Sequence, residues 1–272
     1  EQYQRYTQEQ VDEVVTAAAW AIMKPENNRV LADLAVADSG LGNAQDKFDK
    51  NYRKTLGLLR DLKGAKSVGV IAEYPQLGLV EIARPVGVVA VITPSTNPGA
   101  TPANKIINTL KCRNAAVIAP SPKGLSTCVK LLEFVHAEFA KIGAPADLVQ
   151  HLPAPVTKDL THELMRQADL VAATGSQANI RAAYASGTPA VGVGAGNVVV
   201  IVDSSADPAD AAAKIVRSKT FDNATSCSSE NSAVILADVY DAMLSELAKL
   251  GGVLLDAKEK LQLEGVMFPN GK

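Results

Sequence analysis

The chain has 272 residues, 47% of them hydrophobic, and 27 Lys and Arg residues stand against 29 Asp and Glu residues. This length holds one large domain or two modest ones with a buried core, and the balanced charge argues against nucleic acid as a partner. No apolar run approaches the roughly 20 residues that a membrane-spanning helix needs, and no basic and then apolar leader opens the sequence, so we expect a cytoplasmic protein that binds small molecules and no membrane.

The N-terminal third is predicted to be helical. Thr7 with Gln10 three residues later has the pattern of a capping box, and apolar residues at helical spacing follow it. A second helix is expected within residues 43–62. Residues 67–85 then alternate and turn as a β-hairpin does, with Pro75 and Gly78 near the bend.

From residue 86 onward, apolar strands alternate with amphipathic helices. Strands are predicted at 86–94, 115–122, 148–154, 170–175 and 198–203, with helices such as 125–143 and 176–187 between them. This order is typical of a parallel sheet covered by helices on both faces, so we predict an α/β fold with a doubly wound, Rossmann-like sheet. Asp207 and Pro208 are expected to begin a further helix as its N-cap and first residue.

The segment VITPSTNPG, residues 91–99, ends a predicted strand in hydroxyl and amide side chains. Open α/β sheets bind ligands at the carboxyl ends of their strands, which makes Asn97 a candidate site residue. A polar turn capped by Asn97 explains the same letters equally well.

Two glycine-containing segments are further candidates. In ATGSQAN, residues 173–179, a strand runs through Gly175 and Ser176 into a helix whose free N–H groups could face a phosphate, although Ser176 as an ordinary N-cap explains the pattern nearly as well. In GVGAGN, residues 192–197, the alternating glycines suggest a backbone that a ligand or another chain segment approaches closely. The alternative is a plain strand connection.

The three cysteines are too few and too scattered for a disulfide framework or a zinc site, and we predict no metal site. Cys227 lies among small polar residues, which argues against the buried, inert position that free cysteines usually take. Cys112 and Cys128 fall on helical stretches and are predicted to be packing residues. No histidine lies in a Cys-His protease pattern.

Three segments in this order resemble the CoA-acylating branch of the aldehyde dehydrogenase superfamily. They are ITPSTNPGATPANKIINTLKCRNA (92–115), AYASGTPAVGVGAGN (183–197) and TFDNATSCSSE (220–230), and the resemblance extends over essentially the whole chain. Within that branch the sequence is similar to acylating sulfoacetaldehyde and succinate-semialdehyde dehydrogenases and to the aldehyde dehydrogenase half of bifunctional aldehyde/alcohol dehydrogenases.

The resemblance implies the aldehyde dehydrogenase fold. Residues 1–221 are then the dinucleotide- and CoA-binding domain with its N-terminal helices, and residues 222–272 are the start of an incomplete catalytic domain. It implies an enzyme that oxidises an aldehyde to an acyl-CoA, with NAD or NADP as cofactor, coenzyme A as cosubstrate, and a homo-oligomeric state at full length. A rival interpretation is a catalytically inactive, nucleotide-binding fragment of such an enzyme.

The resemblance also implies roles by position. Cys227 falls on the family's nucleophile, which carries a thiohemiacetal and then a thioester, and Asn97 falls on its oxyanion-hole amide. The cofactor-lining positions of the family fall on Ile92, Thr93, Pro94, Ser95, Ser121, Pro122, Lys123, Gly175 and Ser176, and the segment near the nicotinamide falls on Gly192, Val193 and Gly194.

Two departures from the hydrolytic members of the family refine the expectation. Those members have a glutamate at the position of Gly192, where it activates water, so its absence disfavours hydrolysis and favours acyl transfer to CoA. The segment APSPKG offers Ser121 and Lys123 but no acid to hold the adenosine ribose, so NADP is admissible beside NAD.

The aldehyde is less determined than the reaction. Sulfoacetaldehyde, acetaldehyde and succinate semialdehyde are all consistent with the resemblance. An anionic aldehyde would need a cationic clamp, for which Lys105, Lys111 and Arg113 are the nearby candidates.

Overall fold

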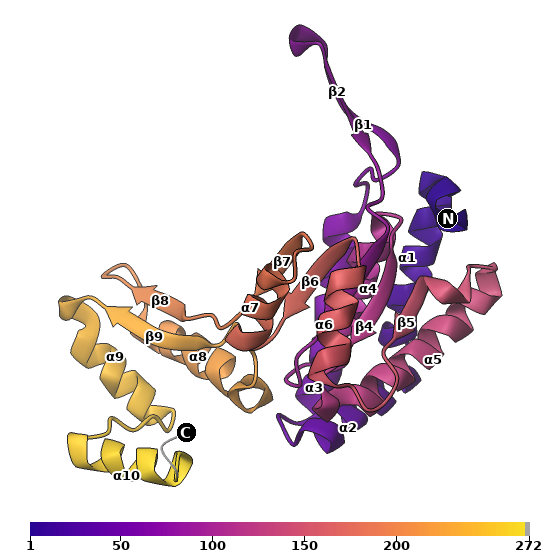
Figure 1. The fold of residues 1–272 in the computed structure, drawn as a ribbon. Coiled ribbons are helices and arrows are strands. Elements are labelled where there is room, and N and C mark those ends of the chain that lie inside the picture. Colours follow the sequence, from indigo (N-terminus) through magenta and orange to yellow (C-terminus); the bar gives the residue numbers. More distant parts are fainter. Residues whose placement is uncertain (270–272) are drawn as a thin grey trace. The chain divides into compact units, whose positions relative to one another are not determined.

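A computed structural model describes residues 1–269, and the chain divides into two compact units, Glu1–Ala195 and Gly196 onward (Figure 1). The boundary between the units precedes the predicted strand at 198–203, whereas the sequence placed the domain boundary at 221/222. The assignment of dinucleotide and CoA binding to residues 1–221 stays a prediction.

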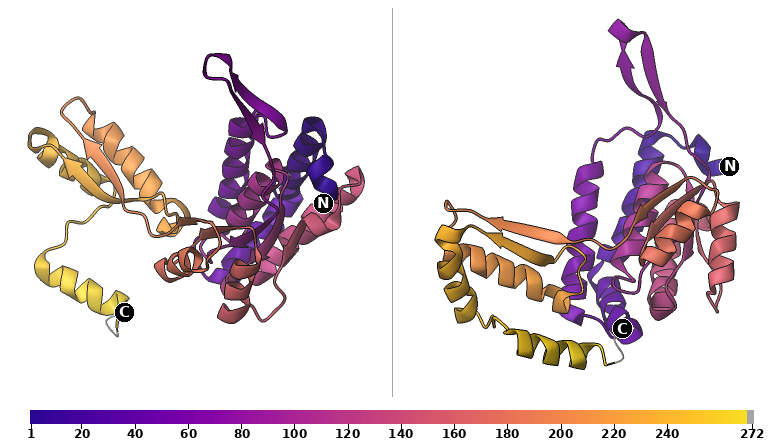
Figure 2. Two further views of the ribbon diagram at one scale, coloured as in Figure 1. Left: turned by 45° about the horizontal axis from the view of Figure 1, so that its top comes forward. Right: turned by 60° about the vertical axis from the view of Figure 1, so that its left-hand side comes forward.

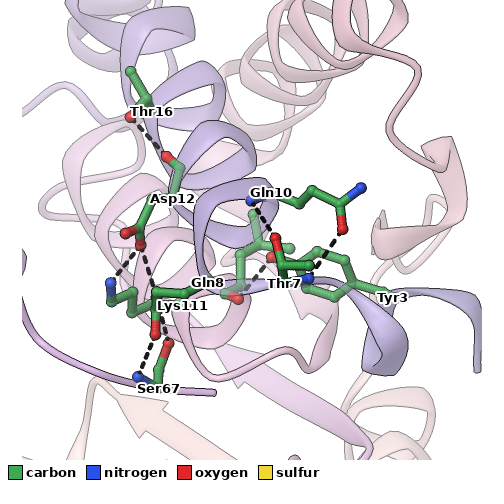
Figure 3. Close-up of polar contacts among 9 residues, drawn as sticks. Tyr3, Thr7, Gln8, Gln10, Asp12, Thr16, Ser67 and Lys111 are labelled. Atoms are coloured by element: carbon green, nitrogen blue, oxygen red, sulfur yellow. Dashed lines mark hydrogen bonds and ion pairs between the residues drawn. The ribbon is translucent and has the colours of Figure 1, made fainter. Parts of the chain in front are cut away.

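Three long helices open the first unit. They are α1 (Gln8–Met23), α2 (Pro25–Ser39) and α3 (Ala44–Leu62), after a single 3-10 turn, η1 (Gln2–Arg5). The predicted capping box of α1 is confirmed: the Gln10 N–H donates to Thr7 Oγ1 at 3.4 Å, and the Thr7 N–H donates to Gln10 Oε1 at 2.9 Å (Figure 3). Helix α2 lies in the N-terminal third, which was predicted to be helical, but it was not predicted as a separate helix. Pro25 in its first turn and the left-handed Gly40 after its last residue delimit it.

A five-stranded parallel sheet forms the centre of the first unit. Its order is β5-β4-β3-β6-β7, and its strands are β3 (Val88–Ile92), β4 (Ala115–Ala119), β5 (Val149–His151), β6 (Leu170–Thr174) and β7 (Ala190–Val193). The connections include α4 (Ala100–Lys111), α5 (Leu125–Ile142), α6 (Lys158–Gln167) and α7 (Gln177–Ala185), with short turns η3 (Pro122–Gly124) and η4 (Ala146–Leu148). The chain enters the sheet at the central strand β3 and adds β4 and then β5 on one side. It then crosses back and adds β6 and β7 on the other side of β3. The predicted doubly wound topology is confirmed, with β7 as an additional edge strand. The strand predicted at 198–203 was wrongly assigned to this sheet, since it pairs in a separate one.

Both faces of the central strands of this sheet are buried, as continuous apolar strands require. Along β3, Val89 and Val91 point into a core cluster that also contains residues of α1, α4 and α5. Ala90 and Ile92 point to the opposite face, where α6 and α7 pack. The helices thus fix the sheet from two sides, and its carboxyl edge is a rigid platform.

The predicted hairpin is confirmed as β1 (Gly69–Tyr74) and β2 (Leu79–Ala83), which pair antiparallel through the turn η2 (Pro75–Leu77). Gly78 takes the left-handed conformation that the turn requires. The hairpin projects away from the sheet (Figures 1 and 2). Its tip is highly exposed, since Leu77 has 70% of its surface accessible.

The second unit contains a parallel strand pair, β8 (Val198–Val202) and β9 (Glu230–Ile235), connected by α8 (Pro208–Thr220) and the turn η5 (Phe221–Ala224). Helices α9 (Ala237–Lys249) and α10 (Ala257–Met267) follow. Asp207 caps α8 as predicted. The buried core is small and consists of Val202, Ala212 and Met243. Across the described part of the chain, no helix combines the length and apolarity that crossing a bilayer demands.

Helix α5 receives its N-terminal cap from a distant segment. Its own N-cap is Gly124, which has no side chain, and Asp38 near the end of α2 supplies the missing acceptor. Asp38 Oδ2 accepts from the Thr127 N–H at 2.9 Å, and its carboxylate also accepts from the Ser126 and Thr127 hydroxyls. Partial burial acts to raise the pKa of Asp38, but these hydrogen bonds together hold it below its ordinary value.

We therefore expect Asp38→Ala to lower the free energy of unfolding at pH 7 by about 1 kcal/mol. Because the folded pKa is depressed, this stabilisation is fully present above the ordinary aspartate value of 3.8 and is lost as the pH falls through the lower folded value. Urea unfolding of both chains from pH 7 down to the lowest pH that preserves the fold would measure it. Asp33→Ala, at an exposed site on α2, is the control and should change stability by less than about 0.5 kcal/mol. A gap between parent and Asp38→Ala that widens toward acid pH would contradict the cap.

Candidate active site

The predicted cofactor residues of β3, β4 and β6 lie at one edge of the parallel sheet. Residues 93–95 follow β3, residues 121–123 follow β4, and Gly175 and Ser176 follow β6. These strands are neighbours in the sheet and run in one direction, so their carboxyl ends are side by side. The winding reverses between β3 and β6, which is where open α/β sheets bind their ligands. Their role in binding stays a prediction.

Backbone hydrogen bonds fix the first part of this edge. The Thr93 N–H donates to Ala119 O at 3.2 Å, and the Ser121 N–H donates to Thr93 O at 3.2 Å. The Ile92 side chain is buried in the core, so this residue can reach a ligand only through its backbone. Pro94, Ser95 and Ser121 are half-buried, whereas Pro122 and Lys123 are exposed.

The turn from β6 into α7 is capped by its own serine. Ser176 Oγ accepts from the Asn179 N–H at 3.3 Å, which confirms the N-cap interpretation. The Gly175 N–H donates to Val193 O at 3.2 Å and ties this turn to β7. Any phosphate at α7 would therefore meet the remaining N–H groups of its first turn.

Gly192, Val193 and Gly194 lie at the end of the edge strand β7 and just after it. The Gly192 N–H donates to Tyr184 Oη at 3.1 Å. A Cβ atom added at Gly192 would lie 2.9 Å from Ile180 Cγ2 and 3.1 Å from Tyr184 Cε2, so α7 leaves no room for a side chain there. The alternating glycines suggested that either a ligand or another chain segment approaches this backbone closely. The contacts with α7 confirm close approach by a chain segment.

Asn97 lies in the turn between β3 and α4, and its backbone shapes that turn. Its carbonyl accepts from the Thr101 N–H at 3.2 Å, and its Nδ2 donates to Thr96 Oγ1 at 3.4 Å. Asn97 Oδ1 accepts from the ammonium of Lys50 in α3 at 2.9 Å. The residue is thus a turn residue and has an oriented amide at the carboxyl edge.

The lysine contact belongs to a feature that sequence reasoning missed. The polar stripe of α3 consists of Lys47, Lys50, Asn51 and Thr55, all of which are buried. On the same helix, Tyr52 and Leu56 are exposed. Their spacing of i, i+3, i+4 and i+8 places the four polar residues on one helical face, and that spacing was the available signal.

Cys227 belongs to the second unit and is exposed, so the prediction that it is not a core residue is confirmed. It lies within a tight turn in which the Ser229 N–H donates to Ser226 O at 3.1 Å. Just before it, residues 222–224 have φ values of 54°, 51° and 60°, the left-handed region that non-glycine residues rarely adopt. The turn presents the thiol instead of packing it. Cys227 and Asn97 belong to different units, and their pairing in one site stays a prediction.

The other two cysteines differ from each other. Cys128 is fully buried, and burial raises the pKa of its thiol to about 12, so it is inert as predicted. The packing prediction is wrong for Cys112, which is exposed because it caps the end of α4.

Two of the three predicted clamp residues are structural. The Lys111 side chain is 5% exposed, and its ammonium pairs with Asp12 of α1 (Figure 3). Arg113 donates to the carbonyls of Gln4 and Ala83. Both lie at the opposite end of α4 from Asn97, roughly 18 Å along a 12-residue helix. Lys105, in the first half of α4, is half-buried, and burial lowers its pKa.

Comparison with known proteins places these features in context. The sequence model described as "Aldehyde dehydrogenase family" matches residues 1–252. The chain is 66% identical over 271 residues to an acylating sulfoacetaldehyde dehydrogenase of Cupriavidus necator, an alignment that covers 100% of this chain and 55% of that protein. The chain therefore spans about half the length of this relative.

Solved structures agree. An acetylating aldehyde dehydrogenase from Geobacillus thermoglucosidasius superposes with a TM-score of 0.92 at 35% identity, over 99% of this chain and 60% of that one. A propionaldehyde dehydrogenase from Rhodopseudomonas palustris, solved with bound CoA and an acylated cysteine, has a TM-score of 0.84 at 26% identity, over 98% of this chain and 60% of that one.

The close packing at Gly192 generates a prediction. We expect Gly192→Ala to lower the free energy of unfolding by about 1–3 kcal/mol, because the new methyl group meets the buried Ile180. Gly194→Ala is the matched control: its methyl group would meet only the end of the flexible Gln177 side chain, so a smaller loss is expected. Denaturant unfolding of the three chains measures both effects. Equal losses in the two variants would show that α7 does not restrict position 192 specifically.

Proposed function

This chain belongs to the aldehyde dehydrogenase family, and we propose that it supplies the dinucleotide-binding edge and the nucleophile of a CoA-acylating aldehyde dehydrogenase. The observation that carries the proposal is the exposed Cys227 thiol on its tight turn. The acylated cysteine in the related propionaldehyde dehydrogenase supports it.

The proposed reaction uses the chain's own groups in sequence. The Cys227 thiolate attacks the aldehyde carbonyl carbon and forms a thiohemiacetal, and the Asn97 Nδ2 group stabilises the oxygen that becomes negative. When bound, NAD or NADP accepts the two electrons and the hydrogen removed from this carbon, which leaves a thioester on Cys227. The thiol of CoA loses its proton to solvent and attacks the thioester carbonyl as a thiolate. The bond to Cys227 then breaks, which releases the Cys227 thiolate, and the acyl group leaves as the acyl-CoA.

Acyl transfer to CoA is favoured over hydrolysis by the geometry at Gly192. This position offers no carboxylate to activate water, and Ile180 and Tyr184 occupy the space beside it. General-base assistance is typically worth about 100- to 10,000-fold, so a thioester without it persists until a better nucleophile arrives. The CoA thiol is that nucleophile.

The residues at the carboxyl edge fit a dinucleotide. Hydroxyl groups of Thr93, Ser121 and Ser176 and the exposed ammonium of Lys123 give a donor set that is neutral or cationic, as an anionic pyrophosphate requires. Lys123 has no hydrogen-bond or ion-pair partner among the residues that the structure describes, so its charge is available to a 2′-phosphate. NADP is therefore proposed beside NAD.

Sulfoacetaldehyde is the proposed substrate, on the strength of the 66% identity to the Cupriavidus necator enzyme. Lys105 is the remaining candidate to face its sulfonate. Acetaldehyde and succinate semialdehyde are the alternatives, and an acetylating relative supports the first of these. We also propose that the full-length protein is a homo-oligomer and that it is located in the cytoplasm.

Aldehyde-dependent reduction of NAD⁺ and NADP⁺, with and without CoA, tests the proposal on this chain and on any longer natural chain that contains it. We expect turnover that requires CoA and that falls by at least about 1000-fold in Cys227→Ala, because the covalent intermediates cannot form. Cys112→Ala, which removes the other exposed thiol, should keep full activity. Dinucleotide binding without turnover in this chain, together with CoA-dependent turnover in the longer chain, would identify this chain as an inactive nucleotide-binding fragment. No turnover in either chain would overturn the proposed function.

Lys123→Met tests the choice of cofactor. We expect the KM for NADP⁺ to rise about tenfold and that for NAD⁺ to change little, because only NADP⁺ offers a 2′-phosphate to the ammonium. Lys130→Met on α5 is the control, since Lys130 already pairs with Glu133. Equal losses for both cofactors would place Lys123 away from the ribose.

A further inference from the structure

We propose that Lys50 is a positioning residue for Asn97: its buried ammonium sets which end of the Asn97 amide faces the reacting oxygen. This inference rests on the proposed function, because it takes Asn97 as the donor to that oxygen. It assigns to α3, a helix outside the parallel sheet, a direct part in preparing the oxyanion site.

The first step is the hydrogen bond itself. Lys50 Nζ lies 2.9 Å from Asn97 Oδ1, and Lys50 is 4% exposed. An ammonium group donates hydrogen bonds and accepts none, so the amide atom that faces it must be the oxygen. Rotating the amide by 180° would place its NH₂ group against the NH₃⁺ group. Lys50 therefore excludes the orientation in which Asn97 would offer an oxygen to the substrate.

The second step concerns the strength of the amide as a donor. A hydrogen bond from an ionised donor is roughly twice as strong as one between neutral groups, and burial strengthens it further. The Lys50 charge draws electron density toward Asn97 Oδ1 and so polarises the N–H bonds on the other side of the amide. Lys50 thereby prepares Asn97 to receive negative charge without touching the substrate.

The third step is that the backbone of this loop is already held. Lys47, one turn before Lys50, donates to Thr96 O at 2.7 Å. Pro98 packs so closely on Gly124 that an added Cβ there would lie 2.6 Å from Pro98 Cβ. With the main chain fixed on both sides of Asn97, the orientation of its amide is what remains to be specified. Lys50 specifies it at Oδ1 at 2.9 Å, and the longer bond from Nδ2 to Thr96 Oγ1 at 3.4 Å is compatible with the same orientation.

The test uses a chain that shows CoA-dependent turnover. Lys50→Met keeps the aliphatic stem and removes the ammonium, and we expect kcat to fall about 10- to 100-fold with the KM values for aldehyde and dinucleotide within about twofold. Lys50→Arg retains a donor-only group and should recover part of the loss. Lys50→Gln can donate to or accept from Asn97, so both amide orientations become populated and an intermediate kcat is expected.

A double-mutant cycle with Asn97→Ala separates positioning from a general structural effect. If Lys50 acts through Asn97, adding Lys50→Met to Asn97→Ala costs no further activity, whereas independent losses multiply. Multiplied losses, or full kcat in Lys50→Met beside an impaired Asn97→Ala, overturn the inference and leave the proposed function intact. Full kcat in Asn97→Ala overturns the proposed oxyanion role itself. Thermal unfolding of each variant shows whether it folds, and Lys50→Gln takes the place of Lys50→Met in the cycle if the methionine variant does not.

Discussion

Two buried ammonium groups hold the loop that follows the first strand of the sheet, and the orientation of Asn97 depends on them. Burying a lysine is costly unless its ammonium donates to good acceptors. Lys47 and Lys50 are both buried, so their hydrogen bonds to Thr96 O and Asn97 Oδ1 hold these two oxygens in place. Leucines on the second half of helix α3 pack against the main core cluster. Its buried polar face defines the loop, and the candidate chemistry lies on that loop.

The parallel sheet could be predicted because its strands are buried on both faces. Every residue of a strand such as β3 must then be apolar, and the resulting runs stand out between amphipathic helices. The edge strand β7 is short and half-exposed, so it has no comparable run, and its glycines suggested a closely approached backbone and no strand. Helix α2 was not predicted as a separate helix because polar and apolar residues are mixed along it. Only its end signals at Pro25 and Gly40 mark it.

The candidate site was predictable where it follows from topology, since the carboxyl ends of neighbouring parallel strands must meet at one edge. It was not predictable where distant side chains meet. Lys111 and Arg113 are cations near Asn97 in sequence, yet the length of α4 carries them away, and Asp12 and backbone carbonyls take up their donors. Lys50 is far from Asn97 in sequence and lies against it in space. Periodicity shows which face of a helix is unusual, but it does not show what that face meets.

The crowding at Gly192 also bears on how enzymes of this family diverge. Ile180 is buried in a core cluster, whereas Tyr184 is largely exposed and can turn away at the cost of its hydrogen bond from the Gly192 N–H. Ile180 is therefore the main obstacle to a glutamate at position 192. A chain with a smaller residue at position 180 would accept that glutamate more easily. The order of substitutions is constrained: the permissive change on α7 comes first and alters no chemistry, and the change that recruits water comes second. A close contact between two segments thus makes a glutamate at position 192 hard to introduce in a single step.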